Sequence, residues 1–337
     1  MKLSYHLLIV GLVVFVVIAA LVALCVGVVN LSVADVLDAI VSCVQTGFSP
    51  STTAEIIVMN VRMPRIITAI FVGASLAIAG AVYQSVFHNP LVSPDLLGVS
   101  SGSCVGVAVS ILLGLGSIFN VVLAFVGGIL AVGITVLIPN VMRNRSSTML
   151  VLSGVMVSGF LSSILGIIKY MADNEDKLET ITYWQFGSFA HTQYGTLKMV
   201  FPILVFSFVA LMLFSWRINL FSLEDLEVQT LGVNIEKERL VIIIFSTLLT
   251  ASATSISGTV GWVGLVVPHF ARMLVGDNST KLLPVASLLS AGLMIVVDSL
   301  CRSISGLEIP IGIITGVVGA PIFSGILIQQ KKREHSI

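Results

Sequence analysis

The sequence predicts an all-α polytopic membrane protein with about ten transmembrane helices. Its 337 residues are 56% hydrophobic and only 10% charged, and the mean hydropathy is +1.08. A soluble domain of this length would carry more charge on its surface. Apolar runs about one bilayer thick recur along the chain, separated by polar breaks that contain proline and glycine. No second soluble domain is indicated, so residues 1–337 are expected to form one transmembrane domain.

Hydropathy and turn residues place each predicted span in order. The first apolar run is longer than the core of a signal peptide, so it is expected to be retained as a helix. Small residues recur inside the spans, as at Gly73, Ala77 and Gly80, and they let helices approach closely in lipid. The predicted spans are residues 5–29, 64–87, 92–115, 118–141, 148–171, 195–216, 238–257, 259–276, 282–304 and 310–330.

Lysine and arginine residues set the predicted orientation, because cytoplasmic loops are enriched in them. With the N-terminus inside, eleven of the 17 such residues fall in cytoplasmic segments and six fall outside. Both termini are therefore predicted to be cytoplasmic. Residues 30–61 and 172–194 become outer loops, and residues 217–238 become the longest cytoplasmic loop.

The first outer loop is predicted to contain one or two short amphipathic helices. Asp35, Asp38 and Glu55 are expected on their polar sides. The cytoplasmic loop contains the segment LEDLEVQTLGV, which indicates a short helix with Leu223, Leu226 and Leu231 on its apolar side. An ordinary surface helix and a helix that docks on a partner both fit this pattern.

Motifs of the common enzyme classes are absent from the sequence. It has no GxxxxGK[ST], HExxH or GxSxG segment. Its four cysteines form no CxxC pair, so no metal site or disulfide framework follows from them. The net charge is zero, which gives no indication of nucleic-acid binding. We therefore expect no catalytic residue, metal ligand or cofactor, and no nucleic-acid partner.

Asp298 is the one ionisable residue that lies clearly within a predicted span. Arg302 follows four residues later, so the two side chains share one helix face. A carboxylate inside the membrane could hold the coupling ion of a secondary transporter. The alternative, which we favour, is a local pair near the outer end of the helix, in which Asp298 orients Arg302.

Arg62, Arg65 and Arg302 are predicted at the outer mouths of their helices. The forked guanidinium group suits carboxylates, which favours docking of an acidic partner. Contact with lipid phosphates would place arginines at helix ends equally well. Position alone leaves both interpretations open.

The chain resembles the FecCD-type permeases of ATP-binding-cassette (ABC) importers for ferric siderophores, haem and cobalamin. The resemblance covers residues 62–323 in order, and Trp262 stands where the family usually has phenylalanine. Its motifs are RxPR at Arg62–Arg65, GAxLAxxG at Gly73–Gly80, Gln84, NPL at Asn89–Leu91, Pro94, LGVSxG at Leu97–Gly102, YW and GS at Tyr183–Ser188, GWVGLVVPH at Gly261–His269 with Arg272, LEIPIG at Leu307–Gly312 and GAPIF at Gly319–Phe323.

This resemblance implies a type II importer permease fold like that of the cobalamin permease. It also implies a plasma-membrane dimer, of two copies or of one copy and a paralogue, in a bacterium or an archaeon. Two ABC ATPase subunits and one external substrate-binding protein would be its partners, beside membrane lipid. The permease itself would not be an enzyme, and the spans near 148–171 and 310–330 would line its pathway.

The resemblance also implies roles for individual residues. Arg62, Arg65 and Arg302 would receive acidic residues of the binding protein, and their exposed charges would make that association sensitive to salt. The cytoplasmic gate would lie at Asn89, Pro90 and Leu91. The coupling helix that seats in the ATPase would include Leu223, Glu224, Leu226, Leu231 and Gly232.

A ferric siderophore is the first choice of cargo, because it is the commonest cargo of such permeases. Haem and cobalamin follow, and molybdate is more remote. An ion-coupled secondary transporter is the alternative from a different class. A protonophore would abolish uptake by such a carrier even while cellular ATP is maintained.

Overall fold

A computed structural model describes residues 4–45, 50, 52–144, 146–172, 175–222, 233–304 and 308–334. These residues form helices joined by short loops and contain no β-strand. The first half comprises α1 (Tyr5–Cys25), α2 (Val33–Gln45), α3 (Thr53–Ile56), the π-helical turn η1 (Ile57–Arg62), α4 (Met63–Val86), the 3₁₀ turn η2 (Pro94–Leu97), α5 (Val99–Leu113), α6 (Ser117–Val141) and α7 (Ser147–Tyr170). The second half comprises α8 (Glu175–Phe186), α9 (Tyr194–Leu213), α10 (Ser215–Ile218), the 3₁₀ turn η3 (Asn219–Ser222), α12 (Ile235–Ser257), α13 (Val263–Val275), α14 (Ser279–Ser303) and α15 (Ile311–Glu334).

The predicted spans are confirmed as helices. Within the described residues, seven helices are long and apolar enough to cross a membrane. Three shorter apolar helices, α5, α13 and the first part of α15, account for the remaining predicted spans. The described residues therefore have the all-helical membrane architecture that the sequence predicts.

The main differences from the sequence-based expectation are at three helix starts, and α1 also ends at Cys25 instead of at residue 29. The α4 helix does not begin at residue 64 but continues α3 and η1 without a break, which gives one helix from Thr53 to Val86. The α5 helix begins at Val99, because Gly98 has φ of +87° and interrupts the span. The α13 helix begins at Val263, because Gly258 and Trp262 also have positive φ, at +68° and +69°.

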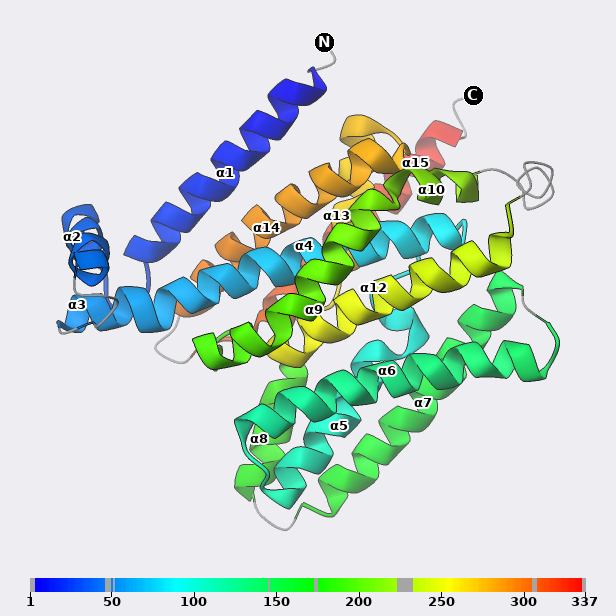
Figure 1. Cartoon of the computed structure of the whole chain (residues 1–337), viewed down its shortest axis with the longest axis horizontal. Coiled ribbons are helices and arrows are strands. Elements are labelled where there is room, and N and C mark those ends of the chain that lie inside the picture. The colour runs from blue at the N-terminus through cyan, green and yellow to red at the C-terminus, as the bar shows by residue number, and fades with distance from the viewer. Residues whose placement is uncertain are drawn as a thin grey trace.

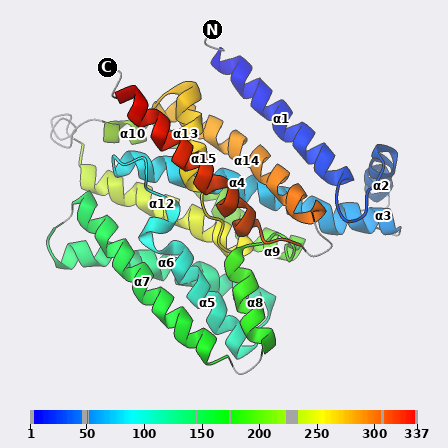
Figure 2. The ribbon, with the colours of Figure 1, turned by 180° about the vertical axis from the view of Figure 1, so that it is seen from behind.

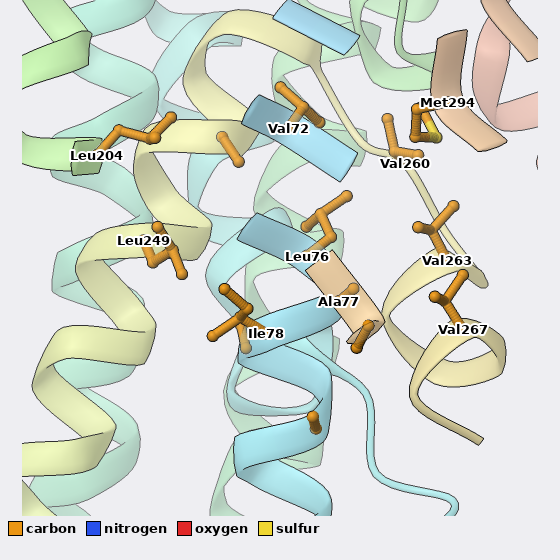
Figure 3. Close-up of a cluster of buried hydrophobic side chains, with 14 of the residues drawn as sticks. Val72, Leu76, Ala77, Ile78, Leu204, Leu249, Val260, Val263, Val267 and Met294 are labelled. Carbon is orange, nitrogen blue, oxygen red and sulfur yellow. The ribbon is translucent and has the colours of Figure 1, made fainter. Parts of the chain in front are cut away.

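The α4 helix is the centre of the bundle. It belongs to the most buried of the long spans, Thr53–Val86, in which 83% of an apolar stretch of 18 residues lies inside the molecule. Figure 1 shows α4 running between α14 on one side and α12 and α9 on the other. In Figure 3, Val72, Leu76 and Ile78 of α4 lie among side chains of neighbouring helices, including Leu204 of α9 and Met294 of α14. The burial of this apolar surface fixes the position of both ends of α4, where candidate site residues lie.

The helices at the edge of the bundle expose apolar side chains, as expected for contact with lipid. The α1 helix packs on α14 and is only 22% buried. Residues 99–170 form a second group in which α5 packs against α6 and α7, at the bottom of Figure 1. Gly102 and Gly106 permit the close contact, because a Cβ atom at Gly106 would lie 1.9 Å from the carbonyl oxygen of Leu123.

The segment predicted to be the first outer loop contains the expected amphipathic helix, α2. Its buried side includes Val36, Ala39 and Cys43, and Asp35 and Asp38 are exposed. The prediction for Glu55 is wrong, because that residue is only 5% exposed. The Glu55 carboxylate accepts a hydrogen bond from the backbone N–H of Thr52, and the Thr52 side chain accepts one from the backbone N–H of Glu55. This reciprocal capping turns the Glu55 side chain back over the start of α3 and away from solvent.

We expect the start of α2 to loosen at acidic pH. The Asp35 carboxylate accepts hydrogen bonds from the Ser32 hydroxyl, at 2.7 Å, and from the Ser32 backbone N–H, at 3.0 Å. These bonds hold the pKa of Asp35 below its ordinary value of 3.8. Because the folded pKa is lowered, the stabilisation is complete above the unfolded pKa and is lost as the pH falls through the folded pKa.

Hydrogen–deuterium exchange of residues 33–45 measures this effect after correction for the intrinsic exchange rate. Protection should be lower at a pH of about 3 than at about 6. An Asp35→Asn variant should show no such difference between the two conditions. Equal protection of the unmodified chain at both pH values would contradict the expectation.

Candidate functional site

Four charged side chains from three parts of the chain form an ion-pair cluster beside the start of α4, in which three are buried and Glu308 is partly exposed. The Arg65 guanidinium lies 2.8 Å from Asp298 Oδ1 and 2.6 Å from Glu308 Oε1. On the other side of the same carboxylate, Arg302 Nε lies 3.1 Å from Asp298 Oδ2. Asp298 is 1% exposed, and Arg65 and Arg302 are 2% and 5% exposed. We call these four residues, together with Arg62, the arginine cluster.

Arg62 is covered by the end of α1 and the loop that follows it. Its two terminal nitrogens donate to the backbone carbonyls of Leu24 and Val29. Gly27 permits this contact, because a Cβ atom there would lie 3.0 Å from Arg62 Nη2. Arg302 also donates to this region, to the carbonyl of Ala23 at 3.3 Å.

The structure therefore brings the three predicted arginines together but does not expose them. The expectation of exposed charges at Arg62, Arg65 and Arg302 is wrong for the single chain, in which each is at most 5% exposed. The predicted pair of Asp298 and Arg302 is confirmed, and Arg65 adds a second partner that helix spacing could not indicate. The role of these arginines in docking stays a prediction.

The predicted gate residues follow the opposite end of α4. The backbone N–H of Leu91 donates to Asn89 Oδ1 at 2.9 Å, and the N–H of Asn89 donates to the Gln84 carbonyl at 3.1 Å. Asn89, Pro90 and Leu91 are all exposed. They form a turn at the surface of this chain, so their role as a gate stays a prediction.

The predicted coupling residues Leu223, Glu224, Leu226, Leu231 and Gly232 lie outside the described residues. The chain on either side is described. The η3 turn packs on α4 with Phe221 buried, and α12 begins after Asn234, whose side chain accepts from the Lys237 backbone N–H at 3.1 Å. Figure 1 shows both flanks at the end of the bundle where α4 terminates.

Three breaks in the helices meet at a junction that the sequence analysis did not identify. The backbone N–H of Ser188, after α8, donates to the Ser257 carbonyl at 2.8 Å, at the end of α12. The N–H of Ile311, at the start of α15, donates to the Gly187 carbonyl at 2.9 Å. Gly187 and Gly258 both have positive φ, and a Cβ at Gly258 would lie 2.2 Å from the Trp184 carbonyl oxygen. Irregular backbone among apolar helices is stable here because neighbouring segments satisfy its polar groups.

A polar cavity of about 250 Å³ adjoins this junction. Asp95, from η2, lies in its wall and accepts a hydrogen bond from the Ser100 hydroxyl. The expectation that Asp298 is the one ionisable residue clearly within a span overlooks Asp95, which falls inside the predicted span of residues 92–115. Pro94 and Gly98 on either side were the available signal, because both residue types interrupt helices and mark irregular backbone. The other polar lining residues are Ser101, Ser162, Gln185 and Thr259.

The described residues contain no group of three or more histidine, cysteine, aspartate or glutamate side chains placed to hold a metal ion. The polar groups of the arginine cluster and the junction cavity can bind or exclude charged molecules.

Comparison with known proteins identifies the kind of membrane protein that carries these features. The profile of the FecCD transport family matches residues 13–329. The molybdate import system permease protein MolB of Haemophilus influenzae is 40% identical over 98% of this chain and 97% of its own length. The "Probable iron chelatin transport system permease protein" of Helicobacter pylori (strain 26695) is 40% identical over 83% of this chain and 85% of its own.

A solved structure shares the arrangement of the helices. It is an inward-facing conformation of an ABC transporter assigned to the metal-chelate type, and it matches with a TM-score of 0.85 and 36% identity. The match covers 96% of this chain and 98% of the other. The sequence and the fold therefore agree over nearly the whole length, and the chain belongs to the FecCD transport family of ABC importer permeases.

Proposed function

We propose that this permease carries an iron chelate, with a ferric siderophore as the first candidate. The observation that carries the proposal is the lack of fixed charge on the two helices expected to line the pathway. Neither α7 from Ser147 to Ile168 nor α15 from Ile311 to Ile328 contains an ionisable residue. Both helices lie on the near face of the molecule in Figure 2. Such walls suit a bulky chelate whose metal charge is shielded by an organic ligand.

Molybdate is the second candidate, because the Haemophilus relative named for it is similar over 98% of this chain. The uncharged segments of α7 and α15 argue against it, because they offer a small dianion no positive group to offset the loss of its hydration. Haem and cobalamin remain alternatives within the family, since relatives with those names are each 32% identical to this chain.

The remaining steps belong to the same proposal. The permease works as a dimer, with both termini in the cytoplasm, against two ATPase subunits and one external binding protein. When the ATPases close on ATP, the coupling segment near residues 223–232 transmits their motion to the two permease halves. Asn89, Pro90 and Leu91 close the pathway on the cytoplasmic side. An ion-coupled carrier is disfavoured by membership of an ABC importer family.

The decisive experiment identifies the cargo. The purified cognate binding protein is offered labelled ferric siderophore, haem, cobalamin and molybdate, and the retained ligand is then supplied to the complex in proteoliposomes. We expect retention of the ferric siderophore, with uptake that requires ATP and persists with a protonophore. Retention of molybdate alone would replace the cargo assignment. Uptake without any ATPase subunit would overturn the importer mechanism.

We expect Arg62→Gln to weaken the binding protein's affinity for the reconstituted transporter. In the proposed docking, the binding protein displaces the loop at residues 26–32, and a carboxylate then pairs with the freed guanidinium. Loss of one charge-assisted hydrogen bond predicts about a tenfold weaker affinity. Lys198→Gln is the matched control, because Lys198 is exposed at the start of α9 and is not among the predicted docking residues. The docking role is wrong if both variants bind as tightly as the unmodified chain.

A further inference from the structure

A second cavity, which shares Ser188 and Ser257 with the junction, lies at the end of the bundle that carries α8. It has a volume of about 420 Å³ and lies between α8, the starts of α6 and α9, and the end of α12. Figures 1 and 2 both show α8 beside α5 at this end of the molecule. We call it the α8 pocket. Its wall includes Ser117, Asn120, Glu179, Tyr183, Trp184 and Thr192.

Two polar atoms in the wall of the α8 pocket have no hydrogen-bond partner within the described part of the chain. They are Asn120 Oδ1 and Thr192 Oγ1, and each is buried. The Thr192 residue as a whole is 7% exposed. A buried acceptor without a partner is costly, which points to a bound donor at this place.

The charge in the pocket wall is negative. Glu179 is its one carboxylate, His191 is the one basic side chain in the lining, and no lysine or arginine is among the lining residues. The nearest lysine along α8, Lys177, donates instead to the Leu112 carbonyl at 3.0 Å. An occupant that matches this wall must therefore bring positive charge.

Two aromatic side chains narrow the chemistry of the occupant. Tyr183 and Trp184 line the same pocket, and their ring faces favour a nearby cation. A primary ammonium has three N–H donors, enough for Glu179, Asn120 Oδ1 and one hydroxyl. A quaternary ammonium would satisfy the charge and the rings but could not donate to Asn120. A divalent metal would require more carboxylates than the single one present.

We propose that the α8 pocket binds a primary ammonium group, supplied by the headgroup of an aminophospholipid such as phosphatidylethanolamine. The neighbouring surface fits the acyl chains of a lipid, because Ile118 and Phe119 at the start of α6 are 63% and 52% exposed. The bound headgroup links α8 to α6. The α8 helix leads into Gly187, which accepts a hydrogen bond from the start of α15, and Ser188, which donates one to the end of α12. The lipid therefore also stabilises the junction.

Lipid retention by the full-length chain tests this site. The chain is reconstituted in nanodiscs with equal amounts of phosphatidylethanolamine, phosphatidylcholine and phosphatidylglycerol, and the lipids retained after extraction are measured by native mass spectrometry. We expect phosphatidylethanolamine to be enriched over phosphatidylcholine about tenfold, the ratio for one charge-assisted hydrogen bond. Soluble phosphoethanolamine is added in a parallel arm. If phosphoethanolamine displaces the lipid, a soluble amine reaches the same site. That result supports the ammonium chemistry and shows that the ligand need not be a lipid.

Two variants separate the pocket from general lipid preference. Glu179→Gln and Asn120→Ala should each remove most of the enrichment. Glu175→Gln is the matched control, because Glu175 is exposed in the first turn of the same helix and does not line the pocket. The proposal is overturned if phosphatidylcholine is retained equally, or if the Glu179 and Glu175 variants behave alike. The measurement uses neither cargo nor ATPase, so its outcome does not depend on the proposed transport function.

Discussion

Replacing Asp298 with alanine should destabilise the chain by about 3–5 kcal/mol, the cost of breaking a buried ion pair from one side. Asp298 lies between Arg65 and Arg302, at 2.8 Å and 3.1 Å, and is 1% exposed. Without its carboxylate, two buried guanidinium groups would share one site with only Glu308 nearby. Glu308 cannot compensate fully, because its side chain is 38% exposed and, within the described residues, its ion pair is with Arg65.

The unfolding midpoint of the purified chain in detergent measures this effect. Asp277→Ala is the matched control. Asp277 also pairs with an arginine, Arg272, at 3.2 Å, but its side chain is 85% exposed, so its loss should change stability by no more than about 0.5 kcal/mol. Adding Arg65→Met to Asp298→Ala should recover part of the loss, because it removes one uncompensated charge. Equal midpoints for the Asp298 and Asp277 variants would show that the cluster contributes little to folding.

The arginine cluster also shows how far the sequence can predict a site. The spacing of four between Asp298 and Arg302 indicated their pairing, because helix geometry fixes that contact locally. Nothing local indicated that Arg65 shares the same carboxylate from 233 residues away. Its burial depends on how α14 and the end of α1 pack against α4, and hydropathy treats each span on its own. The predicted exposure of the arginines failed for this reason.

The helix breaks show the same difference between features that are local in the sequence and features that depend on tertiary packing. The number and order of the spans could be predicted, because each apolar run is a local property of the chain. The later starts of α5 and α13 could not, because they depend on backbone turns at Gly98, Gly258 and Trp262. Trp262 shows this best, since no pattern rule predicts a positive φ for a tryptophan. Gly258 belongs to the junction, and Gly98 follows the turn that places Asp95 in the wall of its cavity, so the least predictable backbone carries part of the candidate site.

The sequence predicts that glycines allow close helix packing, but only the structure identifies the helix that packs against each glycine. Gly80 was expected to let two helices approach closely, and it contacts the start of α13. A Cβ atom at Gly80 would lie 1.8 Å from the carbonyl oxygen of Gly264. Gly264 has no room to retreat, because a Cβ on its own Cα would lie 2.6 Å from the Pro94 ring. Backbone from α4, α13 and η2 is thus stacked at one point.

We therefore expect Gly80→Ala to lower stability by about 1–3 kcal/mol or more, as overpacking does where the neighbouring atoms are backbone. It should also reduce ATP-driven uptake in proteoliposomes, because moving α13 or η2 disturbs the junction cavity. Gly133→Ala is the matched control, since Gly133 is exposed inside α6 with nothing within 4 Å of its added Cβ. That variant should be neutral or more stable by up to about 1 kcal/mol, because alanine favours a helix over glycine. The same chemical change would then have opposite signs at two helical glycines, and a gain in unfolding midpoint at Gly80 would disprove the close contact between α4 and α13.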